Sequence, residues 1–227
     1  MQSKHLFRLA MVAGLTLSAT AQAALYDRGG GLIYDDDRNI TWLADANYAK
    51  TSGYDADGAM DWVTAKTWAA NLSYFDAVRG VTYTDWRLPN LVQPDLSCGS
   101  QSGGDSYGDF CSGSEMGHLF YQELSGISRL SIIYSGDADL SLFQNIQAPG
   151  YAGGIFWTES EYSSTYAWYF SMAEGIQNRT NNTREFYAWA VRPGDVAAVP
   201  EADTWALMLA GLGLVGLAVK RRQRVGS

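Results

Sequence analysis

The fold depends most on three aromatic runs: IFWT at residues 155–158, YAWYF at 166–170 and FYAWAVR at 186–192. Aromatic and β-branched side chains favour strands, because they pack well on a pleated surface. Glu174-Gly175 and a polar stretch at 178–183 supply turn-forming residues between the second run and the third. We therefore expect three strands in this part of the chain.

Two helices and a hairpin are predicted ahead of these strands. Apolar side chains recur every three or four positions through residues 61–75, and Asp61 can cap the first turn. Residues 114–124 show a similar pattern, with Ser114 as the cap. Residues 31–43 have the form of two short strands around a polar turn. This mixture predicts an α+β domain.

The segment DWRLP at residues 85–89 is short, extended and ended by proline. Trp86 and Leu88 alternate with Asp85 and Arg87, so we expect the apolar pair to face the core. The charged pair should face outward or pair locally. Arg87 has a second option, which is a buried ion pair that ties this segment to the terminal strands.

The start of the chain has the features of a secretory signal peptide at residues 1–23. Lys4 and Arg8 precede or flank a short apolar stretch, and AQA at residues 21–23 has the form of a cleavage site. The apolar stretch is too short for a good membrane-spanning helix. We therefore favour a cleaved signal over an uncleaved anchor.

The end of the chain combines a short motif, an apolar run and a basic cluster. Residues 205–219 carry no charge, and their 15 positions would span about 22 Å as a helix. The hydrocarbon core is about 30 Å thick, so Trp205 and Lys220 would have to lie in its two interfaces. This pattern predicts a C-terminal membrane helix at 205–219, with the basic residues on the cytoplasmic side.

The motif before the apolar run, Val199-Pro200-Glu201, completes a pattern that resembles a PEP-CTERM sorting signal. Ala202 stands where the usual motif has a second proline. The resemblance implies that residues 199–224 are a sorting tail, and that an exosortase-type enzyme of a Gram-negative bacterium is a partner. The protein would be anchored transiently in the inner membrane and then reach the periplasm, the cell surface or the extracellular matrix. The alternative is a plain tail anchor.

Residues 24–198 remain as one exported domain, long enough to bury a core of its own. It holds 10 of the 16 basic and 22 of the 24 acidic residues, which gives a net charge of −12. This charge excludes nucleic acid and anionic membrane surfaces as favoured partners. Its two cysteines, Cys98 and Cys111, bracket a Gly/Ser-rich loop, so in an oxidising compartment we predict a disulfide.

Three pieces of the domain together resemble the Lcl C-terminal-domain family. They are GLIYD at 31–35, DWRLP at 85–89, and the strand runs that end in AWAVRP at 188–193. The resemblance implies a C-type-lectin-like α+β fold, in which two helices flank a small antiparallel sheet and the terminal strands are adjacent. It also implies binding at a surface or in a matrix, because relatives include adhesin domains that bind sulfated polysaccharide.

One metal site can be suggested from the sequence. Asp55, Asp57 and Asp61 fall at the third, fifth and ninth positions of an EF-hand-like loop over residues 53–64. They are the candidate ligands for calcium, the one cofactor that the sequence suggests. The bidentate glutamate of that loop is missing, so the alternative is a Gly/Asp turn that leads into a helix capped by Asp61.

We find no set of catalytic residues. His118 is the one histidine of the exported domain, and we interpret it as a surface or partly buried helix residue. Nucleophile–base triads need a base that the chain otherwise lacks, and no GxSxG or HExxH motif occurs. We therefore expect no enzyme. A glycoside hydrolase with paired carboxylates is the alternative.

Aromatic residues point to a binding function, because aromatic faces stack on sugar rings. Most tryptophans fall on helix stripes or strands and are expected in the core. Five loop tyrosines are better candidates for an exposed platform: Tyr48, Tyr54, Tyr107, Tyr151 and Tyr162. We expect an exported surface or biofilm-matrix domain that binds polysaccharide. The alternatives are a matrix glycan hydrolase and a structural matrix protein without a discrete ligand.

Overall fold

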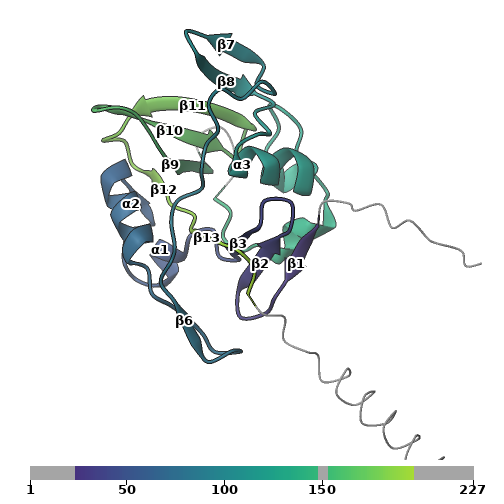
Figure 1. Ribbon diagram of the computed structural model, residues 1–227, viewed down its shortest axis with the longest axis vertical. Coiled ribbons are helices and arrows are strands. Elements are labelled where there is room, and N and C mark those ends of the chain that lie inside the picture. Colours follow the sequence, from purple (N-terminus) through teal and green to yellow (C-terminus); the bar gives the residue numbers. More distant parts are fainter. Residues whose placement is uncertain (1–23, 148–152, 197–227) are drawn as a thin grey trace, which may run out of the picture.

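The computed structural model describes residues 24–147 and 153–196, and Figure 1 shows how they are arranged. Of these residues, 33% lie in strands and 18% in helices. The strands belong to several sheets without a C-type-lectin arrangement. The expected α+β, lectin-like fold with two helices flanking one small sheet is therefore wrong, and the domain is mainly β.

Three sheets build the described part of the chain. The largest has seven strands, in the order β4 (Ala59–Met60), β12 (Phe186–Tyr187), β9 (Ile155–Ser163), β10 (Tyr166–Ser171), β11 (Ile176–Asn181), β8 (Asp105–Asp109) and β7 (Ser100–Ser102). A second sheet has the order β1 (Leu25–Asp27), β2 (Leu32–Asp35), β3 (Ile40–Leu43) and β13 (Val191–Pro193). The third is the hairpin of β5 (Tyr74–Asp76) and β6 (Val81–Tyr83). In Figure 1 this hairpin and the β7–β8 hairpin project from opposite ends of the domain.

The helices are short. They are α1 (Tyr48–Thr51), α2 (Trp62–Asn71), α3 (Glu115–His118), the π-helical turn η1 (Leu119–Glu123), and the 3-10 turns η2 (Ile132–Tyr134) and η3 (Ala138–Leu142). The predicted helix at 61–75 is present as the shorter α2, because the chain enters β5 at Tyr74, and the Asp61 carboxylate caps it by accepting from Thr64 N at 2.8 Å. The predicted helix at 114–124 makes one α-turn and then widens, with Leu124 N donating to Leu119 O at 3.0 Å.

The pleat of the strands divides the core into two clusters. Successive side chains of a strand point to opposite faces. Phe156 therefore belongs to one cluster and its neighbour Trp157 to the other, which also contains the buried face of α2. All seven tryptophans of the exported domain are buried, as the sequence pattern predicted for most of them.

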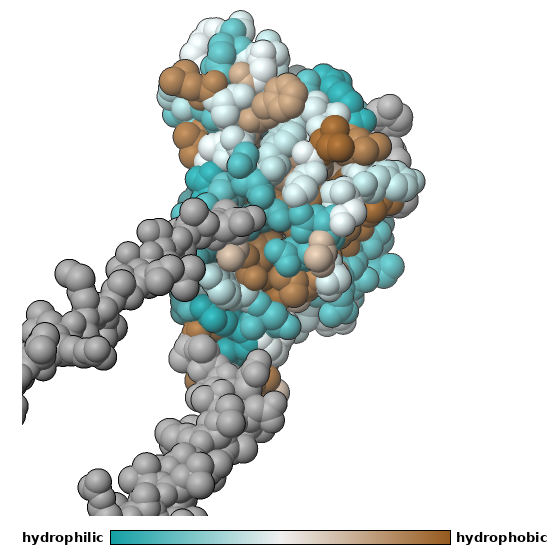
Figure 2. All heavy atoms as spheres, turned by 90° about the vertical axis from the view of Figure 1, so that its right-hand side faces the viewer, coloured by the Kyte–Doolittle hydropathy of each residue, from teal (hydrophilic) through white to brown (hydrophobic). Residues whose placement is uncertain are grey.

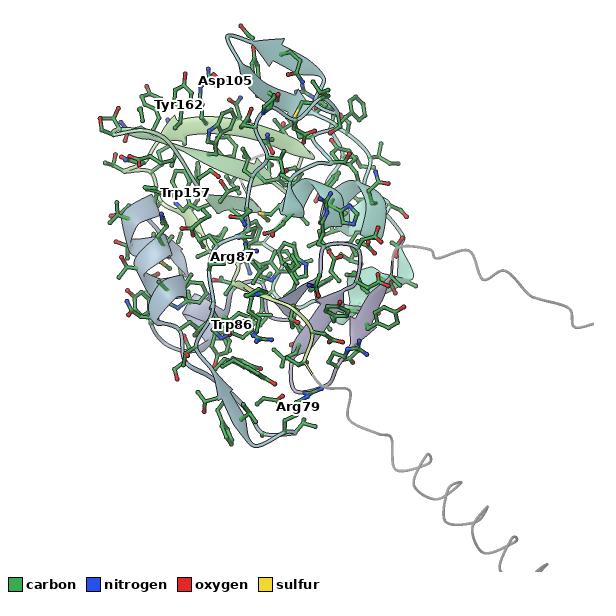
Figure 3. All side chains as sticks on the ribbon, in the orientation of Figure 1. Arg79, Trp86, Arg87, Asp105, Trp157 and Tyr162 are labelled. Atoms are coloured by element: carbon green, nitrogen blue, oxygen red, sulfur yellow. A yellow bond between two sulfur atoms is a disulfide. The ribbon has the colours of Figure 1, made fainter. Side chains whose placement is uncertain are left out.

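The segment 85–89 joins the core to the last strand. Trp86 and Leu88 are buried as predicted, with 3% and 0% of their surface exposed. Arg87 pairs through its backbone with Val191, but its guanidinium binds Glu115 at the start of α3 (2.7 Å). The ion pair with the terminal strand is instead made by Asp85, which binds Arg192 at 2.8 Å. Figure 3 shows Trp86 and Arg87 in the middle of the molecule.

The two ends of the domain lie together, because β13 pairs antiparallel with β3 and Arg28 binds Asp195 at 2.6 Å. No helix in the described ranges is long and apolar enough to cross a membrane. The predicted signal peptide at 1–23 and the predicted membrane helix at 205–219 lie outside the described residues.

Candidate functional site

Two depressions are lined by residues from the segments 48–54 and 71–74, and we call these two depressions together the tyrosine seam. The chain leaves α1 and turns at Gly53, where φ is 75°. The backbone amides of Tyr54 and Asp55 then donate to Ala49 O at 3.0 and 3.1 Å. This turn fixes the backbone of Tyr54 while leaving 53% of the residue exposed.

The first depression has a volume of about 190 Å³. The rings of Tyr48 and Tyr74 meet edge to face in its wall, with centroids 5.2 Å apart. The Tyr74 hydroxyl donates to Gly30 O at 2.7 Å, which holds this ring in place. Polar and apolar groups line the depression together: Gly31, Leu43, Ala44, Asp45, Tyr48, Tyr74 and Gln144.

The second depression has a volume of about 280 Å³ and is more open. Its aromatic residues are the exposed Tyr54 and the buried Trp68. The Asn71 amide, which donates to Thr67 O at 2.9 Å, adds a polar group. The full lining is Ser52, Gly53, Tyr54, Trp68, Asn71, Leu72 and Ser73.

The chemistry of the tyrosine seam suits an uncharged polar ligand. Tyrosine rings offer an apolar face with a polar edge, and amides and hydroxyls supply directional hydrogen bonds. Asp45 is the one carboxylate among the residues that line the two depressions. Its oxygens already accept from Asn47 N, Asn145 Nδ2 and Thr51 Oγ1, at 3.0, 2.9 and 2.6 Å. These hydrogen bonds make Asp45 a support for the backbone and side chains beside the seam.

Two other predicted tyrosines surround a cation rather than a depression. The Arg179 guanidinium lies 4.2 Å from the ring centre of Tyr162 and 5.6 Å from that of Tyr107. It also lies 5.3 Å from the buried ring of Trp168 and binds Asp105 at 3.0 Å. Figure 3 shows Asp105 and Tyr162 at the same end of the molecule. This group ties β8 to the central strands. Tyr151, the fifth predicted tyrosine, lies outside the described residues.

A buried polar group was missed by the sequence analysis. His118 is 6% exposed, and its Nε2 lies 2.9 Å from Glu123 Oε1 and 3.7 Å from Asp37 Oδ2. Asp35 lies beside them and is fully buried. Burial raises the pKa of Asp35 to about 6, opposed by the hydrogen bond from Arg38 N and by the charge of His118. The interpretation of His118 as a surface or partly buried residue is therefore wrong.

The three predicted calcium ligands serve the local backbone. Asp55 Oδ1 accepts from the amides of Asp57 and Gly58, and Asp57 Oδ1 accepts from the amide of Ala59. Asp61 caps α2. Within the described part of the chain, these carboxylates do not gather into a group at metal-ligand distances. Calcium binding by them stays a prediction.

Cys98 and Cys111 are joined by a disulfide, as predicted. The loop between them is not irregular, because β7 and β8 pair within it. The disulfide therefore closes the base of a hairpin. Gly99 N donates to Asp109 O at 2.7 Å beside it.

The features so far define a β-rich domain, followed in the chain by a short motif, an apolar run and a basic cluster. This order is that of a C-terminal sorting signal. Residues 198–222 match the family model of the PEP-CTERM protein-sorting motif. The motif implies export in Gram-negative bacteria and processing by an exosortase-type enzyme. No curated protein and no solved structure matches the chain. The resemblance of residues 24–198 to the Lcl C-terminal-domain family stays a prediction.

Proposed function

We propose that the exported domain binds a neutral polysaccharide at the tyrosine seam, and that the sorting tail delivers it to the cell surface or matrix. The observation that supports this most is the pair of depressions with Tyr48, Tyr54 and Tyr74 in their walls. Their volumes of about 190 and 280 Å³ lie below the range of about 300–1,000 Å³ for drug-sized ligands, so each would hold about one sugar unit of a chain.

The charge of the domain favours a neutral glycan over a sulfated one. A net charge of −12 repels polyanions, most strongly at low salt. Seven of the ten basic residues of the domain are also engaged in ion pairs with carboxylates. Figure 2 shows hydrophilic and hydrophobic residues interspersed on one face of the domain. The resemblance to the Lcl C-terminal-domain family is a second reason to prefer a glycan. Relatives that bind sulfated glycans are expected to use basic surfaces, which this acidic domain lacks, so we propose a neutral glycan instead.

A glycoside hydrolase would need two accessible carboxylates about 5 to 10 Å apart across a cleft. Asp35 and Glu123, whose carboxylate oxygens come within 4.8 Å of each other, are buried and line neither depression of the seam. This arrangement favours binding over hydrolysis.

A glycan screen on the purified full-length protein tests the proposal. Neutral glycans should be retained by the wild-type protein and released unchanged. The variant Tyr54→Ala should reduce retention about fivefold or more, because stacking on one aromatic ring is worth about 1 kcal/mol or more. Glycan turnover would support the hydrolase instead. Retention of no glycan would support a structural matrix protein.

A further inference from the structure

The buried group of Asp35, His118 and Glu123 takes no part in the tyrosine seam. It joins β2 to α3 and to the η1 turn that follows α3 directly, about 80 residues further along the chain. Each of the three side chains offers one ligand atom, and these atoms all lie within 4.8 Å of one another. In the described part of the chain, no lysine or arginine forms an ion pair with either carboxylate.

One oxygen of this group has no hydrogen bond of normal geometry. Asp35 Oδ1 accepts from Arg38 N at 2.9 Å, whereas Oδ2 is buried without such a bond. The Trp42 indole N–H is a donor beside this carboxyl group, but its Nε1 also has no hydrogen bond of normal geometry. A buried carboxylate oxygen without a partner is costly. The nearby Arg38 guanidinium does not supply one, since its Nη atoms donate to Gly113 O and Ser112 O at 3.0 and 2.7 Å.

We propose that Asp35, His118 and Glu123 bind a divalent transition metal ion, with Zn²⁺ as the best candidate. One imidazole nitrogen and two carboxylate oxygens are ligands that zinc accepts. Two carboxylates also balance the charge of a divalent ion, which a single imidazolium cannot do. The ion would supply the missing partner of Asp35 Oδ2.

The distances fit such a site after a small rearrangement, in which the closest pair moves apart and the wider pairs draw together. Zinc ligands lie about 2.0–2.2 Å from the ion, so two ligands of a tetrahedral site are about 3.3–3.6 Å apart. The separation of His118 Nε2 from Glu123 Oε1 is 2.9 Å, and the widest separation in the group is no more than 4.8 Å. Asp37 lies at the edge of the group, with its Oδ2 3.7 Å from His118 Nε2, so water would take the fourth position on the ion. Its side chain is 50% exposed and offers the ion a route from solvent.

The expected role of the ion is structural. It would hold the β2–β3 hairpin against α3 and η1. Without the ion, His118 and Glu123 are hydrogen-bonded to each other. This inference does not depend on polysaccharide binding, so the failure of one leaves the other intact.

Zinc titration of the full-length protein tests the inference. The protein should carry no histidine tag and should be treated with a chelator first. We expect one zinc ion per chain by elemental analysis, with a rise in melting temperature. His118→Gln and Asp35→Asn should each weaken binding by more than about tenfold, since each removes a ligand. Asp36→Asn is the matched control, because it removes one exposed charge from the same turn and should bind as the wild type does.

Two results would overturn the inference. One is equal zinc affinity in the wild type, His118→Gln and Asp35→Asn. The other is no saturable zinc binding by the wild type. If His118→Gln does not fold, Asp35→Asn still decides the question, because asparagine keeps the Oδ1 acceptor for Arg38 N. Cobalt gives a readout on the wild type alone, since its visible spectrum reports imidazole and carboxylate coordination. A spectrum of free aqueous cobalt would contradict the site.

Discussion

Trp86 illustrates how one buried side chain ties the β5–β6 hairpin to the core. It is 3% exposed, its ring packs edge to face against Tyr74 at 5.9 Å, and its Nε1 donates to Tyr83 O at 3.1 Å. Trp86→Ala should lower the free energy of unfolding by about 3–5 kcal/mol, because it leaves a large cavity. Chemical denaturation measures this. Trp86→Phe, which keeps an aromatic ring, should cost less. A loss under about 1 kcal/mol for Trp86→Ala would place this residue outside the core.

Gly58 is a second residue whose identity is dictated by its surroundings. Its φ is +85°, and a Cβ built on it would lie 1.8 Å from Asn47 Oδ1. Gly53 is the matched control, since its φ is +75° and a Cβ there meets nothing within 4 Å. Gly53→Ala should cost about 1–2 kcal/mol from backbone strain alone. Gly58→Ala should cost clearly more, as read by thermal melting. Equal costs would show that Asn47 moves aside freely.

Residue-level predictions succeeded where the local pattern carries the information. The burial of Trp86 and Leu88 and the cap by Asp61 could be predicted from neighbouring residues. The burial of His118 could not be predicted in this way, because its neighbour Asp35 comes from a distant hairpin. A lone histidine on a short helix gives no sign of such a neighbour.

Among the elements, the last strand is tied to the 85–89 segment by an ion pair. Hydrogen bonds from Arg192 lower the pKa of Asp85 below its usual value. A lowered pKa adds stability that is present above the pKa of the unfolded chain and is lost as the pH falls through that of the folded chain. The side chain of Asp85 is 47% exposed, so solvent limits the gain to about 1 kcal/mol or less.

Asp85→Asn should therefore lower the free energy of unfolding slightly at pH 7. The difference from the wild type should shrink as the pH falls through the pKa of Asp85 in the folded protein. Urea denaturation at several pH values, repeated in high salt, measures this. A difference that is the same at every pH would assign the effect to packing rather than charge.

Element-level predictions depended on periodicity. The stripe of α2 and the aromatic runs of β9 and β10 were visible in the sequence. β7 and β8 were not, because SQS and DSYGD lack apolar alternation and their pairing rests on backbone bonds beside the disulfide. The predicted helix at 114–124 was misjudged, because its pattern does not distinguish an α-helix from the π-helical turn of η1. Because these two strands were not predicted and the helix was overestimated, we expected an α+β fold where the domain is mainly β.

For the whole molecule, the sorting motif at 198–222 predicts how the protein is exported and processed. We predict that an exosortase-type enzyme cleaves the chain near Pro200 and releases the domain. Intact mass spectrometry of the protein recovered outside the cell should show a C-terminus that lacks Arg221 and Arg222. Deletion of residues 199–227 provides the comparison, because it removes the motif together with the basic cluster. Retention of both arginines on all molecules would leave only the plain-anchor interpretation.

Only some of the residues that line the candidate site could be predicted from the sequence. Tyr48 and Tyr54 were predicted as platform residues from their polar surroundings, and both line the tyrosine seam. Tyr74 and Asn71 were not, since they join the seam only when the end of α2 packs beside α1. Tyr107 and Tyr162 share the same polar context, yet their rings surround Arg179. Composition identifies a class of residue, whereas tertiary packing decides which members share a depression.

Affinity electrophoresis through gels that contain neutral exopolysaccharide tests polysaccharide binding at the tyrosine seam most directly. We predict that the polysaccharide retards the wild-type protein, and that Tyr54→Ala removes most of this retardation. Tyr134→Ala is the matched control, because Tyr134 is 67% exposed and lines neither depression. This variant should be retarded as the wild type is. Equal retardation of wild type and Tyr54→Ala, or no retardation of the wild type by any neutral polysaccharide, would contradict the account.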